Sequence, residues 1–249
     1  MKAMILAAGL GTRLKPLTDT MPKALVKVDG VPMLERILKS LKRQGFSRIT
    51  VNVHHFPEQI EAFLNSKDFG VNISISDESD ELLDTGGGIV KAHELLFTDD
   101  APVLIHNVDI LSNADLVSLM KYHMESGNDA TLLVSPRESS RKLIFNTNNM
   151  EMVGWHDLTS DNFRPAEISL EEGMVELAFS GIYVIGKEFV EDMREKMGVK
   201  KYSIMEYLLS EKRKLKVGGL LQTDLKLIDI GKPATLSRAP EILNEIEEN

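Results

Sequence analysis

The sequence contains no cysteine. Disulfides and thiolate metal sites are therefore excluded, and cysteine usage does not indicate secretion. The chain also lacks an excess of positive charge, because its formal net charge is −9. An acidic chain must concentrate its cations locally to bind a polyanion. We therefore expect no nucleic-acid partner.

No apolar run approaches the roughly 20 residues that a membrane span needs. The start of the chain, residues 1–8, superficially resembles a signal peptide. Its apolar stretch is interrupted at residues 11–13, which leaves it too short for the apolar region of such a peptide. We expect no membrane partner and a cytoplasmic location. With 249 residues, the chain can bury roughly 70–75% of its unfolded surface without needing disulfides.

Hydrophobic periodicity in the first part of the chain alternates between strand and helix. Leu34, Ile37, Leu38 and Leu41 follow the spacing of a one-faced helix. The run 103–108 has almost no polar break, as expected for a strand covered on both faces. The predicted strands are 4–8, 48–53, 71–75, 103–108 and 131–134, and the predicted helices are 32–44, 57–65, 88–96 and 114–125, the last capped by Asn113.

Strands separated by helices of this length predict an α/β fold, with a Rossmann-like mixed, mostly parallel central sheet and helices on both faces. From about residue 136 the alternation of predicted strands and helices gives way to polar, turn-rich sequence. Further strands are predicted near 143–146, 150–155, 176–185, 214–221 and 226–230, and further helices at 187–197, 203–211 and 233–247. Because no linker or repeat is visible, we predict a single domain over residues 1–249, with 136–249 built onto the same sheet.

The first strand runs into a glycine-rich turn at Gly9 and Gly11, followed by Arg13 and then Lys23. Such a turn lets backbone N–H groups approach phosphate oxygens. Arg supplies a planar, permanent charge for the same oxygens and Lys a point charge. The third glycine of a Rossmann fingerprint would fall at Leu14, and no G-K-S/T follows, so neither that motif nor a P-loop is present.

The string LAAGLGTRLKPLT (residues 6–18), followed by PKALVKV (22–28), resembles the opening signature of the sugar-1-phosphate nucleotidyltransferases. These enzymes join a nucleoside triphosphate to a sugar 1-phosphate and release pyrophosphate. The resemblance implies the nucleotide-diphospho-sugar transferase fold, with Mg²⁺ as cofactor. It assigns nucleotide binding to about 1–135 and sugar-phosphate binding to about 136–249. Arg13 and Lys23 become the expected catalytic residues, and the residues expected to bind the nucleotide here are Leu6, Ala8, Gly9, Gly11, Thr12 and Arg13.

A second glycine-rich segment, D-T-G-G-G at residues 84–88, precedes a predicted helix. Three glycines permit close approach to a ligand, although a flexible loop explains them equally well. The segment is similar to E/D-T-G-G-G in a subgroup that includes N-acetylmuramate-1-phosphate uridylyltransferases and mannose-1-phosphate guanylyltransferases. That resemblance favours UTP or GTP as the nucleotide partner and implies that Asp84, Gly86 and Gly87 bind it.

Two aspartates are candidate metal ligands. Asp109 follows the buried strand at 103–108, and ligands bind at the carboxyl edge of such strands. An unpartnered acid there is costly, so a bound cation explains it better than a capping role. Asp229 closes another short strand before a predicted helix, where a turn aspartate is the alternative. The resemblance implies that both bind one Mg²⁺, although Val108 stands where the family usually has glycine.

The acceptor end is less well defined. Gly181 lies within a strong predicted strand, which indicates either close approach of a ligand or a bulge. The resemblance places Gly181 under the sugar with Glu176, and adds Asn107 and Lys23 as ligands of the sugar phosphate. Many family members carry an E-K-P segment whose lysine holds this phosphate. None is present here, and Arg141 and Lys142 are candidate substitutes.

Three other functions are weighed against this one. A cytidylyltransferase acting on an alcohol phosphate is the nearest. A metal-dependent glycosyltransferase would need an acid-x-acid pair, of which Asn107 to Asp109 supplies one half. An inactive nucleotide-sugar-binding regulator is suggested by Val108 and the missing E-K-P segment. The sequence leaves the base, the sugar, and the choice between monomer and homo-oligomer open.

Overall fold

A computed structural model describes residues 1–210 and 214–247. Within these residues, ten strands form one sheet and four more form two separate two-stranded sheets. The large sheet comprises β1 (Lys2–Leu6), β4 (Arg48–Val53), β5 (Asn72–Asp77), β6 (Val103–Asn107), β8 (Ala130–Ser135), β9 (Arg141–Asn146), β10 (Met152–Asp157), β11 (Asn162–Arg164), β12 (Met174–Ile185) and β13 (Val217–Leu221). The small pairs are β2 (Lys27–Val28) with β3 (Val31–Pro32), and β7 (Ile110–Ser112) with β14 (Leu227–Asp229).

The helices connect these strands and cover the sheet. They are α1 (Met33–Arg43), α2 (Pro57–Asn65), α3 (Asp84–Lys91), α4 (His93–Leu96), α5 (Leu116–Ser126), α6 (Lys187–Met197), α7 (Ile204–Leu208) and α8 (Pro233–Glu247). Three short 3-10 helices follow β1, namely η1 (Thr12–Leu14), η2 (Leu17–Asp19) and η3 (Lys23–Leu25).

The centre of the sheet is parallel. Strand β1 lies between β4 and β6, and β5 continues on the far side of β4, with all three pairings parallel. In this register Leu6 lies level with Asn52 of β4 and Asn107 of β6. The carboxyl ends of three strands therefore meet at one edge, which is where ligands bind in folds of this kind.

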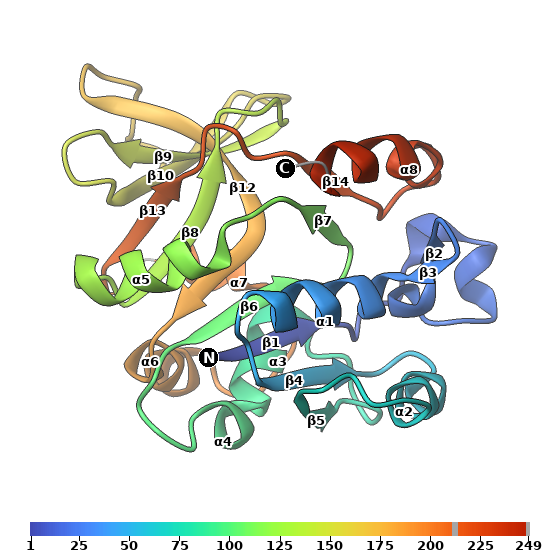
Figure 1. Ribbon diagram of the computed structural model, residues 1–249. Coiled ribbons are helices and arrows are strands. Elements are labelled where there is room, and N and C mark those ends of the chain that lie inside the picture. Colours follow the sequence, from blue (N-terminus) through green and yellow to red (C-terminus); the bar gives the residue numbers. More distant parts are fainter. Residues whose placement is uncertain (211–213, 248–249) are drawn as a thin grey trace.

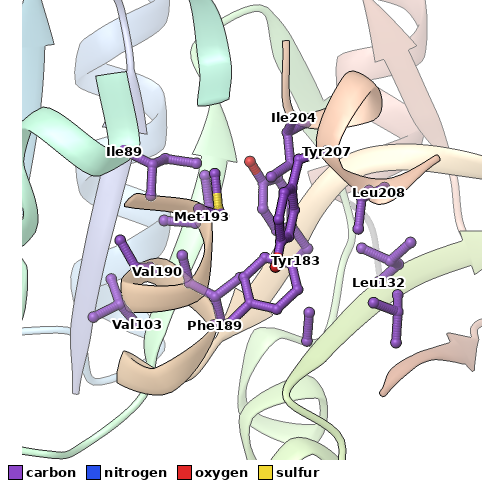
Figure 2. Packing of buried hydrophobic residues seen from close by; sticks show 14 of the residues in the cluster. Ile89, Val103, Leu132, Tyr183, Phe189, Val190, Met193, Ile204, Tyr207 and Leu208 are labelled. Carbon is purple, nitrogen blue, oxygen red and sulfur yellow. The ribbon is translucent and has the colours of Figure 1, made fainter. Parts of the chain in front are cut away.

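Side chains of β1 alternate between two hydrophobic clusters, one on each face of the sheet. Met4 and Leu6 join the cluster that includes α3, α4, α6 and α7, whereas Ala3, Ile5 and Ala7 join the one that includes α1, α2 and α5. Figure 2 shows part of the first cluster around Tyr183 of β12. Coverage of both faces explains why these strands are almost uninterruptedly apolar.

Strand β12 joins the two parts of the chain. Its carboxyl half pairs antiparallel with β6 and β8, and its amino half pairs with β9. The register shifts between Phe179 and Tyr183, where Gly181 has a φ of +77°. A positive φ favours glycine, and a bulge bends the strand. The sheet is therefore continuous across residue 135, as Figure 1 also shows.

The last helix returns to the start of the chain. In Figure 1, α8 lies beside β14 and near the hairpin of β2 and β3. A third hydrophobic cluster unites these segments, with Val28, Met33, Leu111, Ile228 and Ala239 all buried in it. Residues from both ends of the sequence therefore surround the glycine-rich turn that follows β1.

The mixed α/β fold is as predicted, and most elements are found within a few residues of their predicted bounds. Two details were wrong. Helix α5 is capped by Asp115, whose Oδ1 accepts from Ser118 N at 2.9 Å, and not by Asn113. Asn113 instead accepts from Lys226 N at 2.8 Å and so ties this loop to the approach to β14. The predicted helix 88–96 begins earlier, at Asp84, and is divided into α3 and α4.

The predicted helix 203–211 is observed as α7, and residue 211 lies outside the described residues. Over the residues that the structure describes, no helix is both long and apolar enough to cross a membrane.

Candidate active site

A cavity of about 520 Å³ lies at the carboxyl edge of β1, β4 and β6. Its walls come from the turn after β1, the segment leading into α3, the end of β6 and the residues just after β14. The lining residues are Leu6, Ala8, Gly9, Leu10, Gly11, Thr12, Arg13, Lys23, Asn52, Leu82, Asp84, Thr85, Asn107, Val108, Asp109, Lys201 and Gly231.

The turn after β1 is shaped by two different glycines. At Gly9, an added Cβ would meet no atom within 4 Å, so this backbone faces open space. At Gly11, φ is +63° and an added Cβ would lie 2.8 Å from Thr18 Cγ2. Thr18 Oγ1 also donates to the Gly11 carbonyl at 2.9 Å. Gly11 is therefore needed for the conformation of the turn, whereas Gly9 leaves open space beside the backbone where it lines the cavity.

Both predicted cations lie beside the predicted aspartates. Lys23 Nζ donates to Asp109 Oδ2, and the two side chains are only 12% and 14% exposed. Arg13 Nη2 lies 4.0 Å from Asp229 Oδ2, and both of these side chains are about half exposed. The segment after β1 thus places one basic side chain beside each aspartate.

The two aspartates are brought together by the β7–β14 pair. Its register sets Asp229 opposite Ile110, and Ile230 N donates to the Asp109 carbonyl at 3.0 Å. Partial burial raises the pKa of Asp229, and the nearby Asp109 carboxylate, within hydrogen-bonding reach, raises it further. A Cβ added at Gly231 would lie 2.7 Å from Asp229 Oδ1 and 3.2 Å from Asp109 Oδ2.

These carboxylates suit a hard divalent cation. Oxygen ligands are what Mg²⁺ prefers, and it usually takes only one or two carboxylates, with water and substrate phosphates completing the shell. Two facing carboxylates that disfavour each other's charge are also stabilised by a shared cation. Over the described residues, no group of three or more His, Asp or Glu side chains forms a metal site. Asp109 and Asp229 therefore fit a magnesium ion that is held jointly with a phosphate ligand.

The glycines of the D-T-G-G-G segment lie in the first turns of α3 and are buried. A Cβ at Gly86 would lie 2.4 Å from the Tyr202 ring, and one at Gly87 would lie 2.0 Å from the Lys200 carbonyl. These glycines let α3 pack against the segment before α7. Gly86 and Gly87 do not line the cavity, whereas Asp84 and Thr85 do.

At the acceptor end, the bulge of β12 lies against Asn107. A Cβ at Gly181 would lie 2.7 Å from Asn107 Nδ2, so the glycine makes room for this amide. Glu176 lies in the amino half of β12, before Gly181. Its Oε1 is 2.5 Å from His156 Nδ1, and it does not line the cavity. The structure therefore groups Asn107 with Gly181 and separates Glu176 from them.

Neither candidate substitute for the missing lysine reaches the cavity. Arg141 is 71% exposed and pairs with Asp157, and Lys142 Nζ donates to the Arg137 carbonyl. Arg137 is better placed, because its Nη2 donates to the Phe179 carbonyl at 2.8 Å, beside the bulge. Burial lowers the pKa of Arg137, and the charge of Asp229 opposes this shift.

Seven residues that line the cavity were not among the predicted site residues: Leu10, Asn52, Leu82, Thr85, Val108, Lys201 and Gly231. Asn52 left a signal, because it is a polar residue near the carboxyl end of β4, and ligands bind at that end of parallel strands. Lys201 left none, since it reaches the cavity only through the packing of the segment before α7 against α3.

Comparison with known proteins identifies the family of the chain. A family model described as Nucleotidyl transferase matches residues 2–145, more than half of the chain. The chain belongs to the nucleotidyl transferase family of enzymes. One family relative, the N-acetylmuramate alpha-1-phosphate uridylyltransferase of Neisseria meningitidis serogroup B, is 34% identical over 240 residues, which are 96% of each protein.

Other family relatives are longer. The UTP--glucose-1-phosphate uridylyltransferase of Synechocystis sp. is 34% identical over 205 residues, 77% of this chain and 50% of that protein. The mannose-1-phosphate guanyltransferase of Gibberella zeae is 37% identical over 144 residues, 57% of this chain and 39% of that protein. The chain thus spans half or less of the length of these two relatives.

Solved structures share the fold. HddC from Yersinia pseudotuberculosis complexed with GMP-PN has a TM-score of 0.73 at 22% identity, covering 97% of this chain and 99% of that one. The inositol-1-phosphate CTP transferase from T. maritima has a TM-score of 0.77 at 20% identity, covering 100% and 96%. At these identities the likeness concerns the fold alone, and it confirms the mixed α/β architecture of the family.

Proposed function

We propose that the enzyme transfers a nucleoside monophosphate from a nucleoside triphosphate, UTP or GTP, to a sugar 1-phosphate, and that it depends on Mg²⁺. The observation that carries this proposal is the meeting of Asp109 and Asp229 beside Arg13 and Lys23. Asp109, Arg13 and Lys23 line one cavity together with the glycine turn, and Asp229 adjoins it through its contact with Arg13. Such a grouping of acids and cations suits a reaction between polyphosphate anions.

The reaction needs no covalent nucleophile, because the attacking sugar 1-phosphate oxygen is already an anion. That oxygen forms a bond to the α-phosphorus as the bond to the pyrophosphate oxygen breaks. Backbone N–H groups around Gly9 bind the triphosphate, and Arg13 steadies the departing pyrophosphate. Lys23 neutralises charge on the α-phosphate and the acceptor. Asp109 and Asp229 would hold the magnesium ion, which when bound neutralises charge on the reacting phosphate oxygens.

Relatives support the choice of bases and acceptors. Named relatives include uridylyl- and guanylyltransferases that act on glucose, mannose or N-acetylmuramate 1-phosphates. Asp84, Thr85 and Lys201 form the part of the cavity wall that comes from the start of α3 and the segment before α7. We assign this wall to the base, and Asn107 with Gly181 to the acceptor.

The decisive experiment is a matrix of the four ribonucleoside triphosphates against hexose, hexosamine and muramic-type 1-phosphates. Pyrophosphate is converted to orthophosphate by added pyrophosphatase and measured. We expect release with UTP or GTP and one class of sugar 1-phosphate, and none after chelation of Mg²⁺. A metal-dependent glycosyltransferase would yield no orthophosphate, and release only with CTP and phosphocholine would indicate the alcohol-phosphate reaction instead.

Asp109→Ala tests the site directly. Removing a charge stabiliser of this kind typically costs on the order of 100- to 1000-fold in rate. We expect at least that loss for this variant, with Asp224→Ala as the matched control, because Asp224 is exposed just before β14. Near-wild-type turnover of Asp109→Ala would refute the assignment of the metal ligands.

A further inference from the structure

Glu78 is a fully buried carboxylate directly after β5, and the transfer reaction proposed above gives it no role. Both of its carboxylate oxygens are engaged. Oε1 accepts from Asn52 Nδ2 at 2.7 Å, and Oε2 accepts from Leu83 N at 3.1 Å. Burying an acid is costly unless it is fully hydrogen-bonded. Two donors, one from β4 and one from the residue before α3, therefore compensate for the burial of this acid.

The first donor leads to the glycine turn. Asn52 Oδ1 accepts from Ala7 N at 2.6 Å and from Ala8 N at 3.3 Å. Because backbone N–H groups can only donate, the Asn52 amide turns Oδ1 toward Ala7 and Nδ2 toward Glu78, which accepts from it. The backbone that leads into Gly9 is thus oriented by Glu78 through one intervening side chain.

The second donor, Leu83 N, lies directly before α3. Leu83 N immediately precedes Asp84, the first residue of α3, which lines the cavity together with Thr85. The third glycine of the D-T-G-G-G segment makes room for this arrangement. A Cβ at Gly88 would lie 2.6 Å from Glu78 Oε1 and 3.0 Å from Asn52 Nδ2.

We propose that Glu78 is a positioning residue for the nucleotide, which it serves by holding the turn after β1 and the start of α3 at a fixed separation. The proposal rests on the proposed function, which assigns the turn after β1 to the triphosphate and the start of α3 to the base. Glu78 acts through its neighbours, because it does not line the cavity, whereas Asn52, Ala8 and Asp84 do.

Glu78→Gln is the sharpest test, because it keeps the size of the side chain. An amide has one acceptor oxygen, so either Asn52 Nδ2 or Leu83 N would face another donor. Small misplacements of a bound reactant can cost up to roughly 100-fold in rate. We expect KM for the triphosphate to rise about 10-fold, with KM for the sugar 1-phosphate changed less than about two-fold. The matched control is Glu81→Gln, an exposed acid of the same segment.

A double-mutant cycle with Gly88→Ala tests the packing. Alone, the added methyl should push the Glu78 carboxylate aside and raise KM for the triphosphate. In a Glu78→Ala background the closest contact of the methyl is gone and only Asn52 Nδ2, at 3.0 Å, remains of the close contacts, so its further effect should be much smaller. Non-additivity of this kind is expected for groups in direct contact. Full additivity would overturn the proposal.

Affinity is measured by titration calorimetry with UTP and GTP, alongside turnover and thermal unfolding. If Glu78→Gln matches Glu81→Gln in triphosphate affinity, or if it weakens both substrates equally while lowering the melting temperature, Glu78 is merely structural and the inference fails. A wild-type enzyme that binds triphosphate but transfers nothing refutes the proposed function instead, and the affinity comparison still decides the role of Glu78.

Discussion

Lys23 and Asp109 form an ion pair that is almost closed to solvent, between the turn after β1 and the end of β6. The pair links the glycine turn to the metal-binding end of the cavity. Breaking a buried pair by removing one partner is more costly than replacing both, because the remaining charge is left without compensation.

Lys23→Met should therefore lower both stability and activity. We expect a loss of about 3 kcal/mol in the free energy of unfolding, measured with urea, because Asp109 is left buried and unpaired. The double variant Lys23→Met/Asp109→Asn should regain most of this stability and none of the turnover. If activity returned together with stability, Lys23 would be structural and would have no role toward phosphate.

Gly11→Ala should destabilise the protein through the turn itself. A left-handed φ costs a residue with a Cβ roughly 1–2 kcal/mol, and the contact with Thr18 Cγ2 adds to this. Urea unfolding measures the loss. Gly9→Ala serves as the control, because its methyl group meets no atom within 4 Å. Equal destabilisation of the two variants would contradict the different roles assigned to these glycines.

Arg137→Met should weaken binding of the acceptor. A hydrogen bond to a charged group contributes about 2 kcal/mol, so we expect KM for the sugar 1-phosphate to rise roughly 10- to 30-fold with little change for the triphosphate. Steady-state kinetics with each substrate varied in turn measures this. Arg141→Met should behave as the wild type, since Arg141 is exposed and pairs with Asp157. A larger effect at Arg141 than at Arg137 would reverse the assignment.

Stability should fall at alkaline pH through His156. Burial lowers the pKa of this histidine, but hydrogen bonds with Glu176 and Asp161 outweigh burial and raise it. Lys142 lies opposite His156 on β9, and Phe163 stacks on the ring. A group whose pKa is raised by folding adds its full contribution to the free energy of unfolding at pH values below its pKa in the unfolded chain, about 6.5. This contribution is lost as the pH rises through the pKa of the group in the folded protein.

Urea unfolding at pH 6 and pH 9 checks this expectation. The wild type should lose more stability between these two values than His156→Asn does. Glu176→Gln should also reduce the difference, because it removes one of the two carboxylates that favour the imidazolium. If the wild type and His156→Asn showed the same pH dependence, the cluster would contribute nothing to it.

Local signals were sufficient for much of the fold. Helix α1 runs from Met33 to Arg43 within the predicted range 32–44, because one apolar stripe and a following glycine determine it. Strand β6 was evident from an apolar run with almost no polar break. The cap of α5 was missed, because Asn113 and Asp115 are both good capping residues and only contact with Lys226 decides between them.

By itself, the sequence determined the parts of the site that lie within one turn of chain: the glycines after β1, the two cations behind them, and an aspartate at the end of each of two strands. Their properties depend on residue type and on near neighbours. Only the tertiary structure decided which distant groups meet. The β7–β14 register brings Asp229 to Asp109, and close packing of α3 explains the glycine triplet as space for Tyr202, Lys200 and Glu78. The physical reason is that strand pairing and side-chain packing join residues far apart in the chain, and neither contact leaves a periodic pattern in the sequence.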